Sequence, residues 1–261
     1  MKHVALVLLL FTCAAMSQPT PLSESALRGI NFDQKLNSQL SLVLPFQDEA
    51  GKAVRLGDYF GRKPVILVPG YYGCPMLCTL VLNGLIETLQ DLKGSVGGQF
   101  EVINFSIDPD EKAELAAAKK SIYLRRYGRP GAAEGWHFLT GDAAAIQKLA
   151  DQIGFHYAYD PAIKQYAHPS GFVVVTPQGK VVRYFFGVDF SAKDLDRALA
   201  AASSNRTESP VRQFLLLCFH YSPITSKYGG FIFLCVRVCG LVTLLGLGLA
   251  IVKAMRTRKA D

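Results

Sequence analysis

Charged residues are scarce in this chain of 261 residues, and its apolar excess lies near the two ends. Asp, Glu, Lys and Arg make up 19% of the sequence, below the roughly 25% typical of soluble domains, and hydrophobic residues make up 50%. The mean hydropathy is +0.20. This composition excludes an intrinsically disordered chain and argues against a purely soluble protein.

The sequence also lacks a basic stripe interleaved with aromatic residues, so no nucleic-acid partner is expected. Lys2 and the tail from Lys253 to Asp261 together carry +4 of the net charge of +7. Because the positive charge gathers beside apolar runs, it is interpreted as a signal of membrane topology.

The N-terminal apolar run has the pattern of a secretory signal peptide at residues 1–17. Lys2 precedes an apolar run that ends at Phe11, and small residues follow it. A lipoprotein signal at Cys13 is the alternative, although the two residues before that cysteine fit it poorly. Residues 18–41 are expected to form a lead segment ahead of the main domain.

The second apolar run, Phe231 to Val252, has the length of a transmembrane helix rather than of a buried core helix. Its 22 residues reach about 33 Å, enough for a hydrocarbon core of about 30 Å. The basic residues that follow predict a cytoplasmic tail at 253–261. We therefore expect an exported body, a linker and juxtamembrane segment at 204–229 that contacts membrane lipid, and a single span at 230–252.

Between the two ends, strand patterns alternate with helix patterns, which predicts an α/β fold with a mixed sheet flanked by helices. The order of elements matches a thioredoxin-like domain over residues 42–203. Strands are expected at 64–68, 100–107, 136–139, 171–176 and 180–186, and helices at 76–92, 109–127, 142–153 and 191–202. Asp142 and Ser191 are expected to cap the last two helices.

Cysteine is rare in the body of the chain, which keeps two of the six, Cys74 and Cys78. One of the others lies in the signal and three lie in apolar C-terminal segments, where they are expected to pack as small residues: Cys13, Cys218, Cys235 and Cys239. The four-residue spacing of Cys235 and Cys239 would also suit a metal pair.

The positions of Cys74 and Cys78 indicate chemistry. They follow the buried strand at 64–68 and a Gly-rich turn, at the expected start of a helix. A helix N-terminus lowers the pKa of a thiol, and four-residue spacing places both sulfurs on one helix face. Such a pair can bind a soft metal such as Cu(I) or close to a disulfide. Two thiols packed against the sheet are the alternative.

His168 is the candidate for a third ligand. It lies in a loop just before the strand at 171–176, and in a thioredoxin-like fold that loop faces the N-terminus of the cysteine helix. The other histidines lie in the signal, in apolar strands or beside the membrane segment, where structural roles are expected: His3, His137, His156 and His220.

These motifs resemble the Sco/SenC family of copper-binding, thioredoxin-fold proteins that help to assemble cytochrome c oxidase. The resemblance covers residues 40–202 approximately. It rests on Gly73-Cys74-Pro75-Met76-Leu77-Cys78, Phe105-Ser106-Ile107-Asp108-Pro109, Tyr166-Ala167-His168 and Val173-Val174-Val175-Thr176-Pro177-Gln178-Gly179.

The resemblance implies a copper ion bound by Cys74, Cys78 and His168 and delivered to the dinuclear copper (CuA) site of oxidase subunit II. It implies subunit II and a copper donor protein as partners, and a periplasmic domain tethered to the bacterial inner membrane. Two features depart from the family. Ala167 and Pro169 flank His168 where members usually carry Asp and a hydroxyl residue, and the expected anchor is C-terminal rather than N-terminal.

Two functions stay open from the residues. A copper metallochaperone is a binding protein, not an enzyme. A thiol–disulfide oxidoreductase acting on the subunit II cysteines would use Cys74 as an exposed attacking thiol and Cys78 as the resolving one. A peroxidase of the peroxiredoxin type is a weaker third reading, because Thr79 and either Arg125 or Arg126 lack the surrounding PxxxTxxC pattern.

Overall fold

The computed structural model describes residues 29–74, 77–161, 163–205, 237–240, 242–243 and 246, with the side chains of residues 77 and 78 outside the description. The chain divides into two compact units, Met1–Glu208 and Ser209–Asp261. The first unit contains the sheet and the candidate site.

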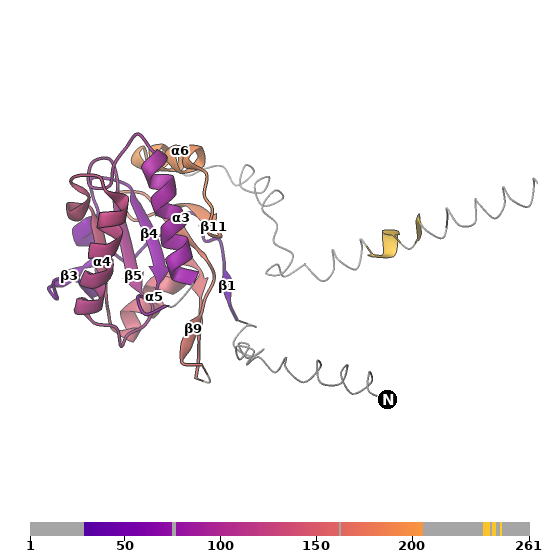
Figure 1. The fold of residues 1–261 in the computed structure, drawn as a ribbon, viewed down its shortest axis with the longest axis horizontal. Helices are drawn as coiled ribbons and strands as arrows, with labels where there is room; N and C mark the ends of the chain where they lie inside the picture. Colours follow the sequence, from indigo (N-terminus) through magenta and orange to yellow (C-terminus); the bar gives the residue numbers. More distant parts are fainter. Residues whose placement is uncertain are drawn as a thin grey trace, which may run out of the picture. The chain divides into compact units, whose positions relative to one another are not determined.

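A five-stranded mixed sheet forms the centre of the first unit (Figure 1). Its order is β11 (Val181–Phe186), β10 (Gly171–Val175), β4 (Val65–Gly70), β5 (Glu101–Ser106) and β6 (Trp136–Leu139). Strands β4, β5 and β6 are parallel, whereas β10 is antiparallel to both β4 and β11. Because both faces are covered, the apolar runs of β4 and β10 are buried almost from end to end.

Helices cover both faces of this sheet. One apolar cluster joins the sheet to α3 (Leu77–Asp91), α4 (Ala113–Tyr127) and α6 (Ala192–Ser203). A second cluster joins the opposite face to α5 (Ala143–Ile153) and to buried residues of the N-terminal segment such as Phe46 and Leu56. In Figure 1, α3 and α4 lie over strands β4 and β5.

Smaller elements complete the unit. They are the paired strands β1 (Asn31–Phe32) and β7 (Phe155–His156), the hairpin of β2 (Pro45–Gln47) and β3 (Ala53–Arg55), the hairpin of β8 (Ala158–Asp160) and β9 (Gln165–Ala167), and the 3-10 turns η1 (Leu56–Tyr59) and η2 (Ala132–Glu134). The β8–β9 hairpin projects from the body just ahead of His168 (Figure 1).

The predicted α/β fold with a mixed sheet is confirmed, and it fits a thioredoxin-like arrangement. The predicted caps are confirmed too: the Asp142 carboxylate accepts a hydrogen bond from the Ala145 amide at 2.7 Å, and Ser191 Oγ accepts one from the Asp194 amide at 3.3 Å. Helix α5 ends at Ile153 and is followed by Gly154, whose φ of 72° lies in the left-handed region that favours glycine.

The predicted start of one helix, at residue 109, was wrong. The sequence predicts a helix from residue 109, but α4 begins at Ala113. The intervening residues form a loop, because the Asp108 carboxylate accepts a hydrogen bond from the Asp110 amide at 2.9 Å and the Asp108 carbonyl accepts one from the Glu111 amide at 3.3 Å. Asp110 and Glu111 therefore lie in the β5–α4 loop instead of a first helical turn.

Most of the predictions for the two ends of the chain concern residues outside the described ones. The predicted signal at 1–17 and tail at 253–261 lie outside the described residues, as do most of the linker at 204–229 and most of the span at 230–252. Among the residues that the structure does describe, no helix has the length and apolar character needed to cross a membrane.

Candidate metal and thiol site

The candidate site begins where strand β4 ends. After Gly70 the chain turns through residues 71–74, and the Cys74 amide donates to the Tyr71 carbonyl at 3.4 Å. Helix α3 then begins at Leu77. The backbone thus runs strand, turn, helix through the two cysteines, and Cys78 lies in the first turn of α3. The position of the Cys78 side chain lies outside the description.

Cys74 is less accessible than the sequence suggests. The oxidoreductase hypothesis predicts an exposed thiol at Cys74, but the residue is only 8% exposed. It belongs to the apolar cluster that packs between the sheet and α5. The turn folds back over the sheet and carries Cys74 into that cluster together with Tyr71. An attacking role for Cys74 would therefore require the loop to move.

His168 lies at the same end of the sheet because of the strand pairing. Strand β10 runs antiparallel to β4, with Val173 opposite Leu67 and Val175 opposite Val65. The beginning of β10 therefore meets the carboxyl end of β4, and His168 precedes β10 by three residues. Its ring centroid lies 5.8 Å from that of Tyr71 in an edge-on arrangement.

A small cavity of about 20 Å³ also joins the histidine to the cysteine helix. His168 lines it together with Gly70, Tyr71, Val81, Leu82 and neighbouring residues of β4 and β5. Val81 and Leu82 stand three and four residues after Cys78 in α3. The histidine and the early part of the helix that carries Cys78 therefore face the same small cavity.

The imidazole of His168 is oriented by its own loop. The residue is 8% exposed, and its Nδ1 lies 2.9 Å from the carbonyl oxygen of Pro169. With the proton on Nδ1, that nitrogen donates to the carbonyl and the ring carries its lone pair on Nε2, as in many metal-binding histidines. The Pro169 carbonyl thus supplies an orienting acceptor at a site where the flanking side chains lack one.

Two of the three predicted ligands, Cys74 and His168, lie among the described side chains. Among the described side chains, no group of three or more His, Cys, Asp and Glu residues is arranged to hold a metal ion. The Cys78 side chain is not among the described side chains, so the ligand set of Cys74, Cys78 and His168 stays a prediction. Of its members, the structure places Cys74 and His168 at one end of the sheet.

The remaining described histidines have structural partners. The His137 ring, on β6, lies against the Tyr59 ring with centroids 4.1 Å apart, and His137 Nε2 is 3.9 Å from Glu101 Oε2. His156 Nε2 lies 3.2 Å from a carboxylate oxygen of Asp33, an ion pair that ties β7 to the segment following β1 when the ring is protonated.

Burial of His137 predicts a pH-dependent stability. Desolvation, followed by the nearby charge of Lys120, lowers the pKa of His137 from 6.5 to about 4. The unfolded chain therefore binds a proton between these pH values that the folded chain excludes, so stability falls as pH drops through this window. At about 1.4 kcal/mol per pKa unit, we expect a loss of about 2 to 3 kcal/mol in the free energy of unfolding.

Denaturant unfolding at pH 7 and pH 4.5 checks this expectation. His137→Gln keeps a polar side chain without a titrating ring. Its free energy of unfolding should therefore fall less than that of the wild type between these two pH values, by most of the expected loss of about 2 to 3 kcal/mol. Equal slopes in the two proteins would contradict the assignment.

The two arginines considered for a peroxidase site, Arg125 and Arg126, make other contacts. Arg125 donates a hydrogen bond to Ser121 on its own helix. Arg126 donates one to Asn83 on α3 and lies 3.5 Å from the carboxylate of Glu87 on the same helix. The two guanidinium groups thus tie down helix surfaces, and nothing in the described residues favours a peroxidase site.

Glu111 is a site residue that sequence reasoning did not identify. Its Oε2 accepts hydrogen bonds from the Tyr72 amide at 2.8 Å and from Ser106 Oγ at 2.6 Å, and its Oε1 accepts one from the Gly73 amide at 2.5 Å. Burial raises the pKa of Glu111, and these three hydrogen bonds oppose that rise. The only sequence signal was an acidic residue shortly after Pro109, which is equally typical of a helix start.

Aromatic side chains of the β8–β9 hairpin continue from the histidine. The Tyr166 ring centroid lies 5.6 Å from that of Tyr71 and 5.1 Å from that of Tyr159, which is half exposed. Desolvation, with a smaller contribution from Asp108, raises the pKa of Tyr166 to about 12. Tyr166 is therefore neutral at physiological pH, and its ring links the Tyr71 ring beside His168 to the Tyr159 ring of the hairpin.

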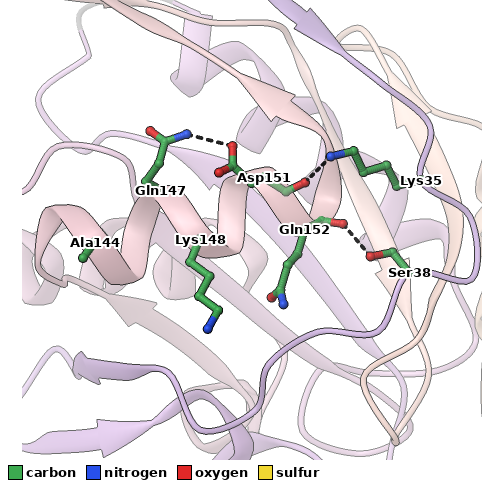
Figure 2. A pocket seen from close by; sticks show the side chains of 7 residues that line it. All are labelled: Lys35, Ser38, Ala144, Gln147, Lys148, Asp151 and Gln152. Carbon is green, nitrogen blue, oxygen red and sulfur yellow. Dashed lines mark hydrogen bonds between the residues drawn. The ribbon is translucent and has the colours of Figure 1, made fainter.

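A larger, shallow pocket of about 520 Å³ lies elsewhere, along α5 (Figure 2). Lys35 Nζ donates to the Asp151 carbonyl at 2.7 Å, and Ser38 Oγ donates to the Gln152 carbonyl at 2.8 Å, so these bonds fasten the N-terminal segment to the helix. The described residues that line this pocket include neither cysteine nor histidine.

Known proteins are similar to this chain over most of its first unit. The SCO1/SenC family model matches residues 34–203. A protein of Aquifex aeolicus VF5 to which electron transfer is ascribed is 27% identical, with 65% of this chain and 95% of that chain covered and a TM-score of 0.57. A search of curated proteins gave no match.

Other similar structures bear Sco names. BsSco, described as a member of the Sco family of cytochrome c oxidase assembly proteins with a disulfide switch, is 24% identical over 67% of this chain and 98% of its own, with a TM-score of 0.52. Arabidopsis thaliana ScoI, solved with copper bound, is 17% identical over 63% of this chain and 99% of its own, with a TM-score of 0.49. From the family match over the sheet and both site loops, this chain belongs to the SCO1/SenC family.

Proposed function

We propose that this chain binds copper through Cys74, Cys78 and His168 and supplies it to the CuA site of cytochrome c oxidase subunit II during assembly. The observation that carries this proposal is the placement of His168 and the Cys74 turn at one end of the sheet, where His168 and the early part of the cysteine helix line one small cavity. The SCO1/SenC family also includes a member solved with copper bound.

The chemistry of the donor set favours Cu(I). Two thiolates and one imidazole are soft or borderline ligands that suit this ion, and a site with few ligands can release it by ligand exchange. Copper is then a cargo that enters from a donor protein and leaves to a recipient. Burial of Cys74 and His168 would limit the access of water and oxidants to the bound ion.

The location is part of the same proposal. An exported body with a C-terminal span and a cytoplasmic basic tail would place the domain in the periplasm, tethered to the inner membrane. The signal pattern at 1–17 and the apolar run at 231–252 support this topology.

Copper transfer is the direct test. The Cu(I)-loaded, full-length chain is mixed with the reduced, metal-free copper domain of subunit II, the two proteins are separated, and copper is measured in each. We expect copper to move to subunit II, and a subunit II variant without its copper-binding cysteines to receive none. Retention of all copper on this chain would contradict the delivery role.

Thiol–disulfide exchange is the second candidate, favoured by the Cys74–Cys78 spacing and by the disulfide switch ascribed to BsSco. A thiolate of the pair would attack a subunit II disulfide, and its neighbour would resolve the mixed disulfide. The pair ends oxidised by two electrons and the partner reduced by two. The buried position of Cys74 makes this role dependent on loop movement.

A further inference from the structure

We propose that Glu111 is a positioning residue that fixes the Cys74 turn in the geometry needed for copper binding. The proposal rests on the copper-binding function proposed above. It concerns a side chain from the β5–α4 loop, a part of the chain that carries none of the predicted ligands.

The contacts of Glu111 hold two successive peptide units. One carboxylate oxygen accepts from the Tyr72 amide and the other from the Gly73 amide, at 2.8 and 2.5 Å. These two peptide groups lie one step before the peptide group that joins Gly73 to Cys74. Because a charged acceptor makes stronger hydrogen bonds than a neutral one, the carboxylate fixes the direction in which the chain enters the ligand.

Glu111 is itself held in place. Ser106 Oγ, at the fully buried end of β5, donates to its Oε2 at 2.6 Å. The same hydroxyl accepts from the Asp108 amide at 3.0 Å, so Ser106 ties the carboxylate to the end of the sheet. A Cβ added at Gly73 would lie 3.2 Å from Glu111 Oε1, a tight contact that glycine avoids.

The turn is also fixed from its other side. The Tyr72 hydroxyl lies 2.7 Å from the Leu139 carbonyl and 3.2 Å from the Asn104 carbonyl, both in the sheet. Backbone amides facing Glu111 and a side chain anchored in the sheet leave the turn little freedom. A turn held in this way orders the first ligand before the metal arrives, which reduces the entropy lost on binding.

Glu111→Gln is the sharpest test because it preserves size while replacing one acceptor oxygen by a donor. One of the two backbone amides would then face an NH₂ group. We expect Cu(I) affinity of the full-length chain, measured by competition with a chromophoric chelator, to fall about tenfold, equivalent to about 1.4 kcal/mol. We also expect a weaker copper–thiolate charge-transfer band and faster hydrogen exchange at the Tyr72 and Gly73 amides.

Two further variants complete the test. Asp110→Asn removes an exposed carboxylate one residue earlier in the same loop and should leave affinity, spectrum and exchange unchanged. Ser106→Ala removes only the hydroxyl that orients Glu111 and should shift all three readouts in the same direction by a smaller amount. It provides the test if the glutamine variant fails to fold.

The outcomes separate this proposal from the one on which it rests. Wild-type affinity and spectrum in both Glu111→Gln and Ser106→Ala would overturn the positioning role, even if amide exchange became faster. Failure of the wild-type chain to bind Cu(I) would overturn the copper function. In that case positioning is judged on exchange alone, where retained protection of the Tyr72 and Gly73 amides in Glu111→Gln contradicts it and lost protection supports it.

Discussion

Replacing His168 by alanine is expected to lower the Cu(I) affinity of the chain by more than about a hundredfold, because loss of a metal ligand should exceed the 10- to 100-fold cost of losing an outer-shell partner. The ring is largely buried between Tyr71 and Phe155, and its Nδ1 faces the Pro169 carbonyl. The alanine variant keeps both thiols, so any remaining binding would reflect the cysteines alone.

His156→Ala is the matched control for this variant. It removes an imidazole that is paired with Asp33 on the short β1–β7 sheet. Cu(I) affinity should therefore stay within about threefold of the wild-type value, well under the 1.4 kcal/mol that a tenfold change represents. Equal affinities for His168→Ala and the wild type would remove His168 from the ligand set.

The second large effect is expected at the cysteines and separates the two candidate functions. Cys74→Ser and Cys78→Ser should each lower Cu(I) affinity by more than about a hundredfold, because a soft thiolate is replaced by a hard hydroxyl. Each should also abolish two-electron thiol–disulfide exchange, since a single thiol cannot close an internal disulfide. His168→Ala should bind Cu(I) much more weakly than the wild type and retain most of any exchange activity.

Cys239→Ser is the control, because this exposed cysteine lies in the second unit of the chain. Its copper affinity and exchange rate should match the wild type. Exchange turnover that survives in Cys74→Ser would exclude the dithiol mechanism. Unaltered copper binding in both serine variants of the pair would exclude the proposed site.

The sequence was most informative where local chemistry decides the structure. The continuous apolar run at Val65–Val68 predicted a strand covered on both faces, and the structure confirms it. Asp142 and Ser191 were recognisable as caps because the capping bond forms within one turn. The expectation that His168 lies near the cysteine helix came from the thioredoxin-like fold, and the antiparallel pairing of β10 with β4 places His168 at that end of the sheet.

What the sequence could not reveal depends on contacts between distant segments. In the sequence Glu111 looks like an acidic residue in the first turn of a helix. Its role in holding the Cys74 turn depends on the approach of Gly73, which lies 38 residues earlier in the chain. Burial of Cys74 likewise depends on how the turn folds over the cluster beneath it. The β8–β9 hairpin was missed because its strands are three residues each, too short to show a period.

The claim on which this account rests is that two sulfurs and one imidazole nitrogen of this chain meet on a single copper ion. Anaerobic titration of the reduced, full-length chain with Cu(I), followed by X-ray absorption at the copper edge, measures this directly. The account predicts one copper per chain with two sulfur ligands and one nitrogen ligand, and loss of the nitrogen in His168→Ala. No binding, or an identical ligand count in the wild type and His168→Ala, would contradict it.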